Sequence, residues 1–223
     1  MKIAIIGTAP HRAQAPFQEE GWEIWACSPG NMNLPRWDYW FEVHDLRWFL
    51  NNEGTEGYME WLRGKAGPQV VMMNPGQAEW AAPCQAFPRA EVLAEWCPDL
   101  MTSSIAWMLA WAIMKKPEEI GIWGVDMAQP SEYGGQRPAL KTLMWEARKR
   151  GIKLVLPAAS DLLLPSKCYG DYLSPVGEKM ERQQQDLLAR IAEAEAKRAE
   201  ADRSVAALRG ALGQVVYVRD TFG

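Results

Sequence analysis

Three short motifs place glycine, hydroxyl or carboxyl groups where a nucleotide could be held. Gly7-Thr8-Ala9-Pro10 follows an apolar run, Thr102-Ser103-Ser104 precedes one, and Gly124-Val125-Asp126 ends another. Glycine turns let backbone N–H groups approach a phosphate, and helix N-termini attract anions. A carboxylate at a strand end can hold a ribose hydroxyl, act as a base or ligate a metal. The motifs predict a nucleotide site made of Gly7, Thr8, Ala9, Thr102, Ser103, Gly124 and Asp126.

Each motif also has a structural explanation, which the sequence leaves open. The first is then a tight turn, the second a helix cap, and Asp126 a cap of the next loop. The first motif has neither the pattern Gly-x-Gly-x-x-Gly nor the pattern Gly-Lys-Ser/Thr. These absences exclude the dinucleotide fingerprint and the phosphate-binding loop of NTPases. The motif therefore matches neither of these two nucleotide-binding signatures.

Acid–base chemistry has three candidates. His11 and His44 are the two histidines of the chain, and each follows a predicted strand or its turn. Because an imidazole titrates near neutral pH, either histidine could be a general base, as could Asp126. The alternative is an ordinary hydrogen-bonding histidine at the rim of the site. Tyr133, in the glycine-containing loop 127–136, is predicted to close over the ligand as a lid residue.

Apolar runs that end in small or polar residues alternate with helical segments along most of the chain. Unbroken apolar runs are typical of strands buried on both faces, and their alternation with helices predicts a parallel sheet. The fold class expected is α/β: a Rossmann-like, open, mostly parallel sheet flanked by helices. The predicted strands are 2–6, 22–27, 39–44, 70–73, 120–126 and 153–156, and the predicted helices are 14–20, 46–51, 55–63, 89–96, 102–116 and 138–150.

Composition limits the function classes. Apolar residues make up 48% of the 223 residues, and the formal net charge of −4 gives no general attraction for nucleic acid. The four cysteines are scattered, so neither a zinc site nor a disulfide framework is expected. We find no signal peptide and no apolar run long enough for a membrane span. These features predict a cytoplasmic protein.

The C-terminal part differs in character from the rest. Residues 1–170 are predicted to form the nucleotide-binding domain, and 175–223 a long helix rich in Glu, Lys, Arg, Gln and Ala. Its apolar and small residues alternate at steps of four and three, which is the heptad pattern of a coiled coil. The helix is therefore expected to form a homo-oligomer through residues 185–215, or to fold back on the domain. The β-prone segment Val215–Val218 is predicted to dock on a neighbour.

Five motifs together resemble a known group of proteins. This group comprises the small bacterial sialyltransferases and the related domain of 6-hydroxymethylpterin pyrophosphokinases and flagellin-modification proteins. The resemblance covers about residues 1–165, and the charged C-terminal helix with its Tyr217 and Thr221-Phe222 ending resembles phage-encoded proteins. The motifs are Ile5–Pro10, Trp25–Ser28, Thr102–Ser104, Ile122–Asp126 and Ser160–Leu163.

The resemblance implies a Rossmann-like domain that binds a nucleotide sugar of cytidine or uridine type without a metal. In those sialyltransferases the matching positions surround a cytidine nucleotide, which adds Ser28 to the predicted site. Lid tyrosines there hold the phosphate, and Tyr133 is the matching residue. The family's catalytic histidine lies in a longer insertion after Gly-x-Asp, whereas the loop that follows Asp126 here is short and has no histidine. This departure counts against sialyl transfer and leaves nucleotide binding unaffected.

Three functions are compatible with these observations. The leading interpretation is a metal-independent glycosyltransferase that uses a nucleotide sugar, with modified phage DNA, a glycan or a small molecule as acceptor. Nucleic acid would then be a partner only as the acceptor. The alternative is a non-catalytic, oligomeric phage protein that binds or sequesters a nucleotide in the host cytoplasm. The third is a scaffold protein in which the C-terminal heptads carry the function.

Overall fold

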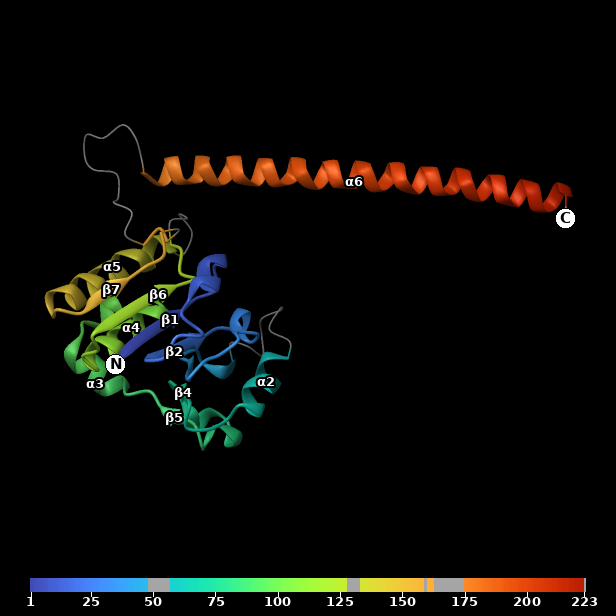
Figure 1. Cartoon of the computed structure of the whole chain (residues 1–223). Helices are drawn as coiled ribbons and strands as arrows, with labels where there is room; N and C mark the ends of the chain where they lie inside the picture. The colour runs from blue at the N-terminus through green and yellow to red at the C-terminus, as the bar shows by residue number, and fades with distance from the viewer. Residues whose placement is uncertain (48–56, 128–132, 159, 163–174, 223) are drawn as a thin grey trace. The chain divides into compact units, whose positions relative to one another are not determined.

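The computed structural model describes residues 1–47, 57–127, 133–158, 160–162 and 175–222. By its internal contacts the chain divides into two units, Met1–Leu163 and Leu164–Gly223. The first unit is an α/β domain, and the described part of the second is one long helix (Figure 1). Each unit is described by itself below.

The sheet of the α/β domain is fully parallel and has its longest strands at the centre. Seven strands pair in the order β5-β4-β3-β2-β1-β6-β7, and every pairing is parallel. This arrangement confirms the predicted fold class. The strands are β1 (Lys2–Ile6), β2 (Trp22–Cys27), β3 (Tyr39–Glu42), β4 (Val70–Met72), β5 (Gln85–Ala86), β6 (Glu119–Trp123) and β7 (Lys153–Val155).

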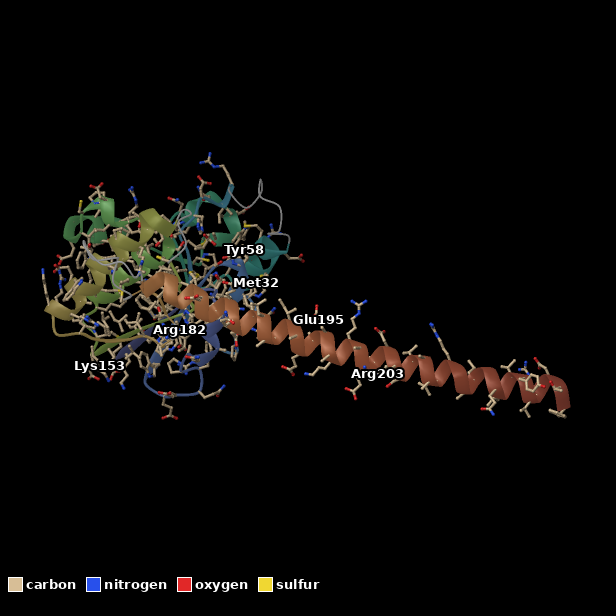
Figure 2. All side chains as sticks on the ribbon, turned by 90° about the horizontal axis from the view of Figure 1, so that it is seen from above. Met32, Tyr58, Lys153, Arg182, Glu195 and Arg203 are labelled. Atoms are coloured by element: carbon tan, nitrogen blue, oxygen red, sulfur yellow. The ribbon has the colours of Figure 1, made fainter. Side chains whose placement is uncertain are left out.

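Both faces of the sheet are covered, as the unbroken apolar strands require. Ile3 and Ile5 of β1 belong to a core cluster shared with α3 (Arg89–Glu95), α4 (Ser104–Met114) and α5 (Tyr133–Lys149). Ala4 and Ile6 belong to a second cluster on the other face. A third cluster joins β3 and β4 to α2 (Tyr58–Gly64) and includes Met32 and Tyr58, both labelled in Figure 2. The described residues of the domain also include five 3₁₀ helices: Pro10–Gln14, Pro29–Asn31, Pro75–Gln77, Glu79–Ala81 and Pro98–Leu100.

Helix α4 is the central helix of the first face. Its residues Ile105, Ala106 and Met108–Ile113 are buried because it packs against β1 and β3 with α3 and α5 beside it. Trp111 lies 5.2 Å from Trp25, centroid to centroid, and 5.4 Å from Phe87. Trp25 and Trp111 are therefore core residues, and their contact holds α4 against the sheet.

Local chemistry explains where predicted bounds differ from the structure. The predicted helix 14–20 does not form, because Pro16 lacks an N–H and disfavours helical geometry at the preceding residue. The predicted strand 39–44 ends at Glu42, whose carboxylate accepts the N–H of His44 at 2.9 Å. The predicted strand 120–126 ends at Trp123, because Gly124 turns the chain with φ +70°.

Two further differences concern segments without a strong apolar pattern. Helix α5 begins at Tyr133 and contains Pro138, whereas the sequence predicted a loop over 127–136 and a helix that starts at the proline. The strand β5 was not predicted, because it has two residues and both are exposed. Only Leu46 and Arg47 of the predicted helix 46–51 are described, and both are helical.

Helix α6 (Pro175–Phe222) is continuous over 48 residues. The segment Val215–Val218 lies inside it and is helical despite its β propensity, and its docking on a neighbour stays a prediction. Side chains project all around the helix in Figure 2, where Glu195 and Arg203 are labelled. Its seam residues are exposed, with Leu208 at 70% and Leu212 at 63%. Neither this helix nor any other in the described residues is long and apolar enough to cross a membrane.

Candidate nucleotide-binding cleft

A cleft of about 820 Å³ lies at the carboxyl ends of β1, β2, β3 and β6, beside the N-terminus of α4. This is the edge at which open parallel sheets bind their ligands, and the volume suits a small molecule. All predicted nucleotide-binding residues except Tyr133 line it: Gly7, Thr8, Ala9, Ser28, Thr102, Ser103, Gly124 and Asp126. Tyr133 is the first residue of α5, and its side chain lies outside the described residues.

Gly7 and Gly124 bring the ends of β1 and β6 into backbone contact. Gly7 N–H donates to the Trp123 carbonyl and Ala9 N–H to the Gly124 carbonyl, each at 2.8 Å. A Cβ on Gly7 would lie 2.3 Å from the Gly124 carbonyl oxygen. Of the N–H groups that follow Gly7, the one on Ala9 is thus used within the fold. Both glycines are required by the close approach of two chain segments, so the floor of the cleft is rigid.

The N-terminus of α4 supplies donors for an anion. Ser103 caps the helix, because its Oγ accepts the N–H of Ala106 at 3.2 Å. Ser104 and Ile105 line the cleft, and their N–H groups lie in the first turn, where a helix has no internal acceptors. The helix dipole places positive potential at the same point. A phosphate group is the ligand that this end of the cleft suits best.

The wall formed by the end of β2 is held by a buried amide. Asn31 Nδ2 donates to the carbonyls of Ile6 and Cys27 at 3.0 and 2.8 Å, which ties β1 to β2. Ser28, the residue that follows β2, has φ +77°. Non-glycine residues adopt this conformation rarely and mostly at functional sites. Burial, with a smaller effect from Glu42, raises the pKa of Cys27 to about 12. Cys27 therefore lines the cleft as an inert thiol.

Asp126 is oriented by two partners from distant parts of the chain. Its Oδ1 lies 3.2 Å from His11 Nε2 and accepts the N–H of Asp161 at 3.3 Å. Asp161 in turn accepts the N–H of Met127 at 2.8 Å, and Arg137 donates to the Asp161 carbonyl at 2.7 Å. The Asp126 side chain is 30% exposed at the cleft. Asp126 is therefore accessible from the cleft, and its contact with a ligand hydroxyl stays a prediction.

His11 contacts Asp126 from the protein interior. The backbone N–H of Gly124 donates to His11 Nδ1 at 2.9 Å, so this nitrogen carries a lone pair and Nε2 carries the proton that points to Asp126. The imidazole is buried, with 6% of the side chain exposed, and it does not line the cleft. Both ring nitrogens of His11 are thus engaged within the fold. The sequence had proposed it as a general base.

His44 lies at the rim of the cleft above a carboxylate that sequence reasoning missed. Its Nδ1 is 2.7 Å from Oε1 of Glu42, and the exposed fractions of the two side chains are 43% and 1%. Tyr58 of α2 donates to Oε2 of Glu42 at 2.7 Å. The hydrogen bond to Glu42 raises the pKa of His44, and burial opposes this effect only in part. Burial and the nearby Glu42 charge raise the pKa of Tyr58 well above its ordinary value.

The remaining lining gives the cleft one apolar wall and few charges. Met101, Ile105 and Trp107 come from α4 and the turn before it, and Met127 follows Asp126. None of the described lining residues is a lysine or an arginine. Within the described ranges, no three His, Cys, Asp or Glu side chains cluster as metal ligands. The cleft thus combines a flat apolar surface, a helix N-terminus, a carboxylate and an imidazole.

Comparisons with known proteins give likenesses of structure. No family model matches the sequence, and no curated protein is similar to it. The fold resembles the Campylobacter jejuni sialyltransferase CstII in complex with a substrate analogue, cytidine-5'-monophosphate. The identity is 16%, the match covers 70% of this chain and 78% of that chain, and the TM-score is 0.45. It also resembles the sialyltransferase CST-II with a trisaccharide acceptor and CMP, at 15% identity over 70% and 80% of the two chains and a TM-score of 0.46.

Proposed function

We propose that this chain binds a nucleotide sugar in the cleft and transfers its sugar to a hydroxyl-bearing acceptor. The observation that carries the proposal is the convergence of Asp126, the α4 N-terminus and the apolar wall on one cleft at the carboxyl edge of the sheet. Ribose hydroxyls would be held by Asp126, the phosphate by the first turn of α4, and the base by the wall with Trp107. Glycans and modified DNA are the two acceptor classes to test.

The charge of the cleft favours a donor with one phosphate. A nucleoside diphosphate sugar carries one more phosphate charge than a nucleoside monophosphate sugar, and that charge needs a metal or a basic side chain close by. Within the described lining, the N-terminus of α4 supplies the positive potential for one phosphate. Of the cytidine and uridine donors that the sequence suggested, the cytidine monophosphate type therefore fits better.

Cytidine-5'-monophosphate is expected to stabilise the protein against heat more than uridine-5'-diphosphate does. A ligand at a hundred times its dissociation constant adds about 2.7 kcal/mol to the free energy of unfolding. For a domain of this size that gain raises Tm by about 5–10 °C. Differential scanning fluorimetry with both nucleotides measures the effect, and no shift with any nucleotide or nucleotide sugar would contradict the proposal.

Turnover separates the transferase from a non-catalytic binder. A cytidine monophosphate sugar incubated with the protein and a glycan or DNA acceptor should release free nucleotide, which chromatography detects. Tight binding with the donor recovered intact would instead favour the sequestering function.

We also propose that α6 joins copies of this chain through its heptad seam. Leu187, Ile191, Leu208 and Leu212 lie on that seam and are all more than half exposed. A double substitution L208E/L212E should therefore convert the oligomer to a monomer, because it places two carboxylates in the packed seam. Light scattering after size-exclusion chromatography measures this mass. Ala206→Glu, off the seam, should leave the mass unchanged, and an equal mass for all three proteins would exclude the seam as the interface.

A further inference from the structure

Glu42 is a buried carboxylate in the central part of the sheet, and three donors surround it. Its side chain is 1% exposed. Oε1 accepts the backbone N–H of His44 at 2.9 Å and faces His44 Nδ1 at 2.7 Å, while Oε2 accepts the hydroxyl of Tyr58 at 2.7 Å. A carboxylate is expensive to bury, and the backbone N–H of His44 at the end of β3 accounts for only one of its three donors. Such a group points to a function for the side chain that it holds.

Tyr58 fixes the direction of the carboxylate. Trp40 Nε1 donates to the Tyr58 oxygen at 2.9 Å, so the tyrosine proton is directed to Glu42. The Tyr58 ring stacks on Trp61, with centroids 6.1 Å apart and planes at 17°. The hydrogen bonds therefore run in one order, from Trp40 to Tyr58 to Glu42, and Glu42 is left to accept from His44. A rigid donor chain of this kind fixes the rotamer of its last acceptor.

The carboxylate decides which nitrogen of His44 carries the proton. An ionised carboxylate only accepts, so neutral His44 must carry its proton on Nδ1 and its lone pair on Nε2. The imidazole lines the cleft and is 43% exposed, whereas Glu42 lies beneath it. Because the two ring nitrogens point in different directions, Nδ1 faces the protein interior and Nε2 faces the cleft side.

We infer that Glu42, held by Tyr58, is a positioning residue that fixes His44 as the general base of the transfer reaction. The inference rests on the function proposed above and selects one base among the three that the sequence left open. His11 is engaged by Gly124 and Asp126, and Asp126 is placed to hold a ligand hydroxyl. His44 is the candidate whose proton-accepting nitrogen is set by a buried partner.

The step balances without a metal or a redox partner. The acceptor hydroxyl oxygen forms a bond to the anomeric carbon of the donor, and its proton moves to Nε2 of His44. The bond between the anomeric carbon and the phosphate oxygen breaks, and its electron pair leaves on that oxygen. The products are the glycosylated acceptor and a nucleoside monophosphate. His44 then returns its proton to water.

The reaction should lose its base when His44 is protonated. The titratable and charged groups around the imidazole are Glu42 and Cys27 beneath it, Tyr58 from α2, Asp126 in the same cleft, and the Asp45–Arg47 ion pair in the following turn. Glu42 is the group that hydrogen-bonds the ring and favours its charged form. The low-pH limb of kcat/KM should accordingly follow His44, and Glu42→Gln should move it to lower pH.

The test reads the tautomer of His44 directly by long-range ¹H–¹⁵N NMR on the full chain. The sequence has two histidines, so two imidazoles are observed. The wild type should show His44 protonated on Nδ1 and His11 protonated on Nε2, without any ligand. Glu42→Gln should lower the pKa of His44, because a neutral amide no longer favours the charged imidazole. Glu60→Gln, an exposed matched change on α2, should leave both rings unchanged.

Activity gives the second readout. With a cytidine monophosphate sugar as probe, His44→Gln should slow turnover by about 10²- to 10⁴-fold. Binding of cytidine-5'-monophosphate should stay within about twofold, because a base acts on the acceptor. An Nε2–H tautomer for wild-type His44, an unchanged titration in Glu42→Gln, or full turnover by His44→Gln would each overturn the inference. If no nucleotide binds at all, the proposed function fails while the tautomer result still tests the Glu42–His44 pair.

Discussion

Substituting Gly124 with alanine is expected to lower the free energy of unfolding by about 3–5 kcal/mol. Two costs add at this position. Gly124 has φ +70°, and a Cβ there would lie 2.5 Å from the Gly7 oxygen, 2.7 Å from the Gly7 carbonyl carbon and 2.8 Å from Arg12 Cβ. Two of these atoms are backbone, so relief requires the ends of β1 and β6 to separate. Denaturant titration followed by circular dichroism measures the loss.

Gly135 provides the matched control. It is an exposed residue of α5, and a Cβ there would meet no atom within 4 Å. Gly135→Ala should therefore add about 0.5–1 kcal/mol by restricting the unfolded chain and favouring helix. If the free energy of unfolding of Gly124→Ala lay within about 1 kcal/mol of the wild-type value, the close backbone contact beneath the cleft would not exist.

The architecture of the α/β domain could be predicted because its central strands consist of consecutive apolar residues, which indicate burial on both faces of a sheet. Ile3–Ile6 can be covered only on both faces, and the all-apolar α4 can lie only against a sheet. Elements without such a pattern were missed or misplaced. β5 has only two residues, and both are exposed. Helix α5 begins at Tyr133, five residues before Pro138, because tertiary context extends it toward its N-terminus. In α6 a continuous helix overrides the β propensity of Val215–Val218.

The candidate site was predictable as a location but less so as a set of roles. Strand ends of a parallel sheet must meet at one edge, which placed Thr8, Ser28 and Asp126 correctly around one cleft. Hydrogen-bond partners depend on contacts across 113 to 115 residues, as between His11 and the segment 124–126, and no local pattern encodes them. Glu42 did leave a signal. It is a carboxylate within an aromatic strand, two residues before a histidine.

Replacing Asp126 with asparagine is expected to weaken the binding of cytidine-5'-monophosphate by about 10- to 100-fold, the value of one hydrogen bond to a charged group. The fold should be little affected, because the amide oxygen can still accept from His11 Nε2 and from the N–H of Asp161. What changes is the side facing the cleft, where a carboxylate accepts from a ribose hydroxyl and an amide N–H cannot. Asp99→Asn, an exposed position that does not line the cleft, is the control.

A nucleotide whose ribose lacks hydroxyls tests whether Asp126 binds these hydroxyls or whether Asp126→Asn weakens binding only by removing a charge. Wild-type protein should bind dideoxycytidine monophosphate more weakly than cytidine-5'-monophosphate, by the same factor that Asp126→Asn costs. In the Asp126→Asn protein the two nucleotides should bind equally, because the hydroxyls have lost their partner. Calorimetric titration of both proteins with both nucleotides gives the coupling energy of the pair directly. A zero coupling energy would mean that Asp126 does not hold the ribose and that its contacts with His11 and Asp161 serve the fold alone.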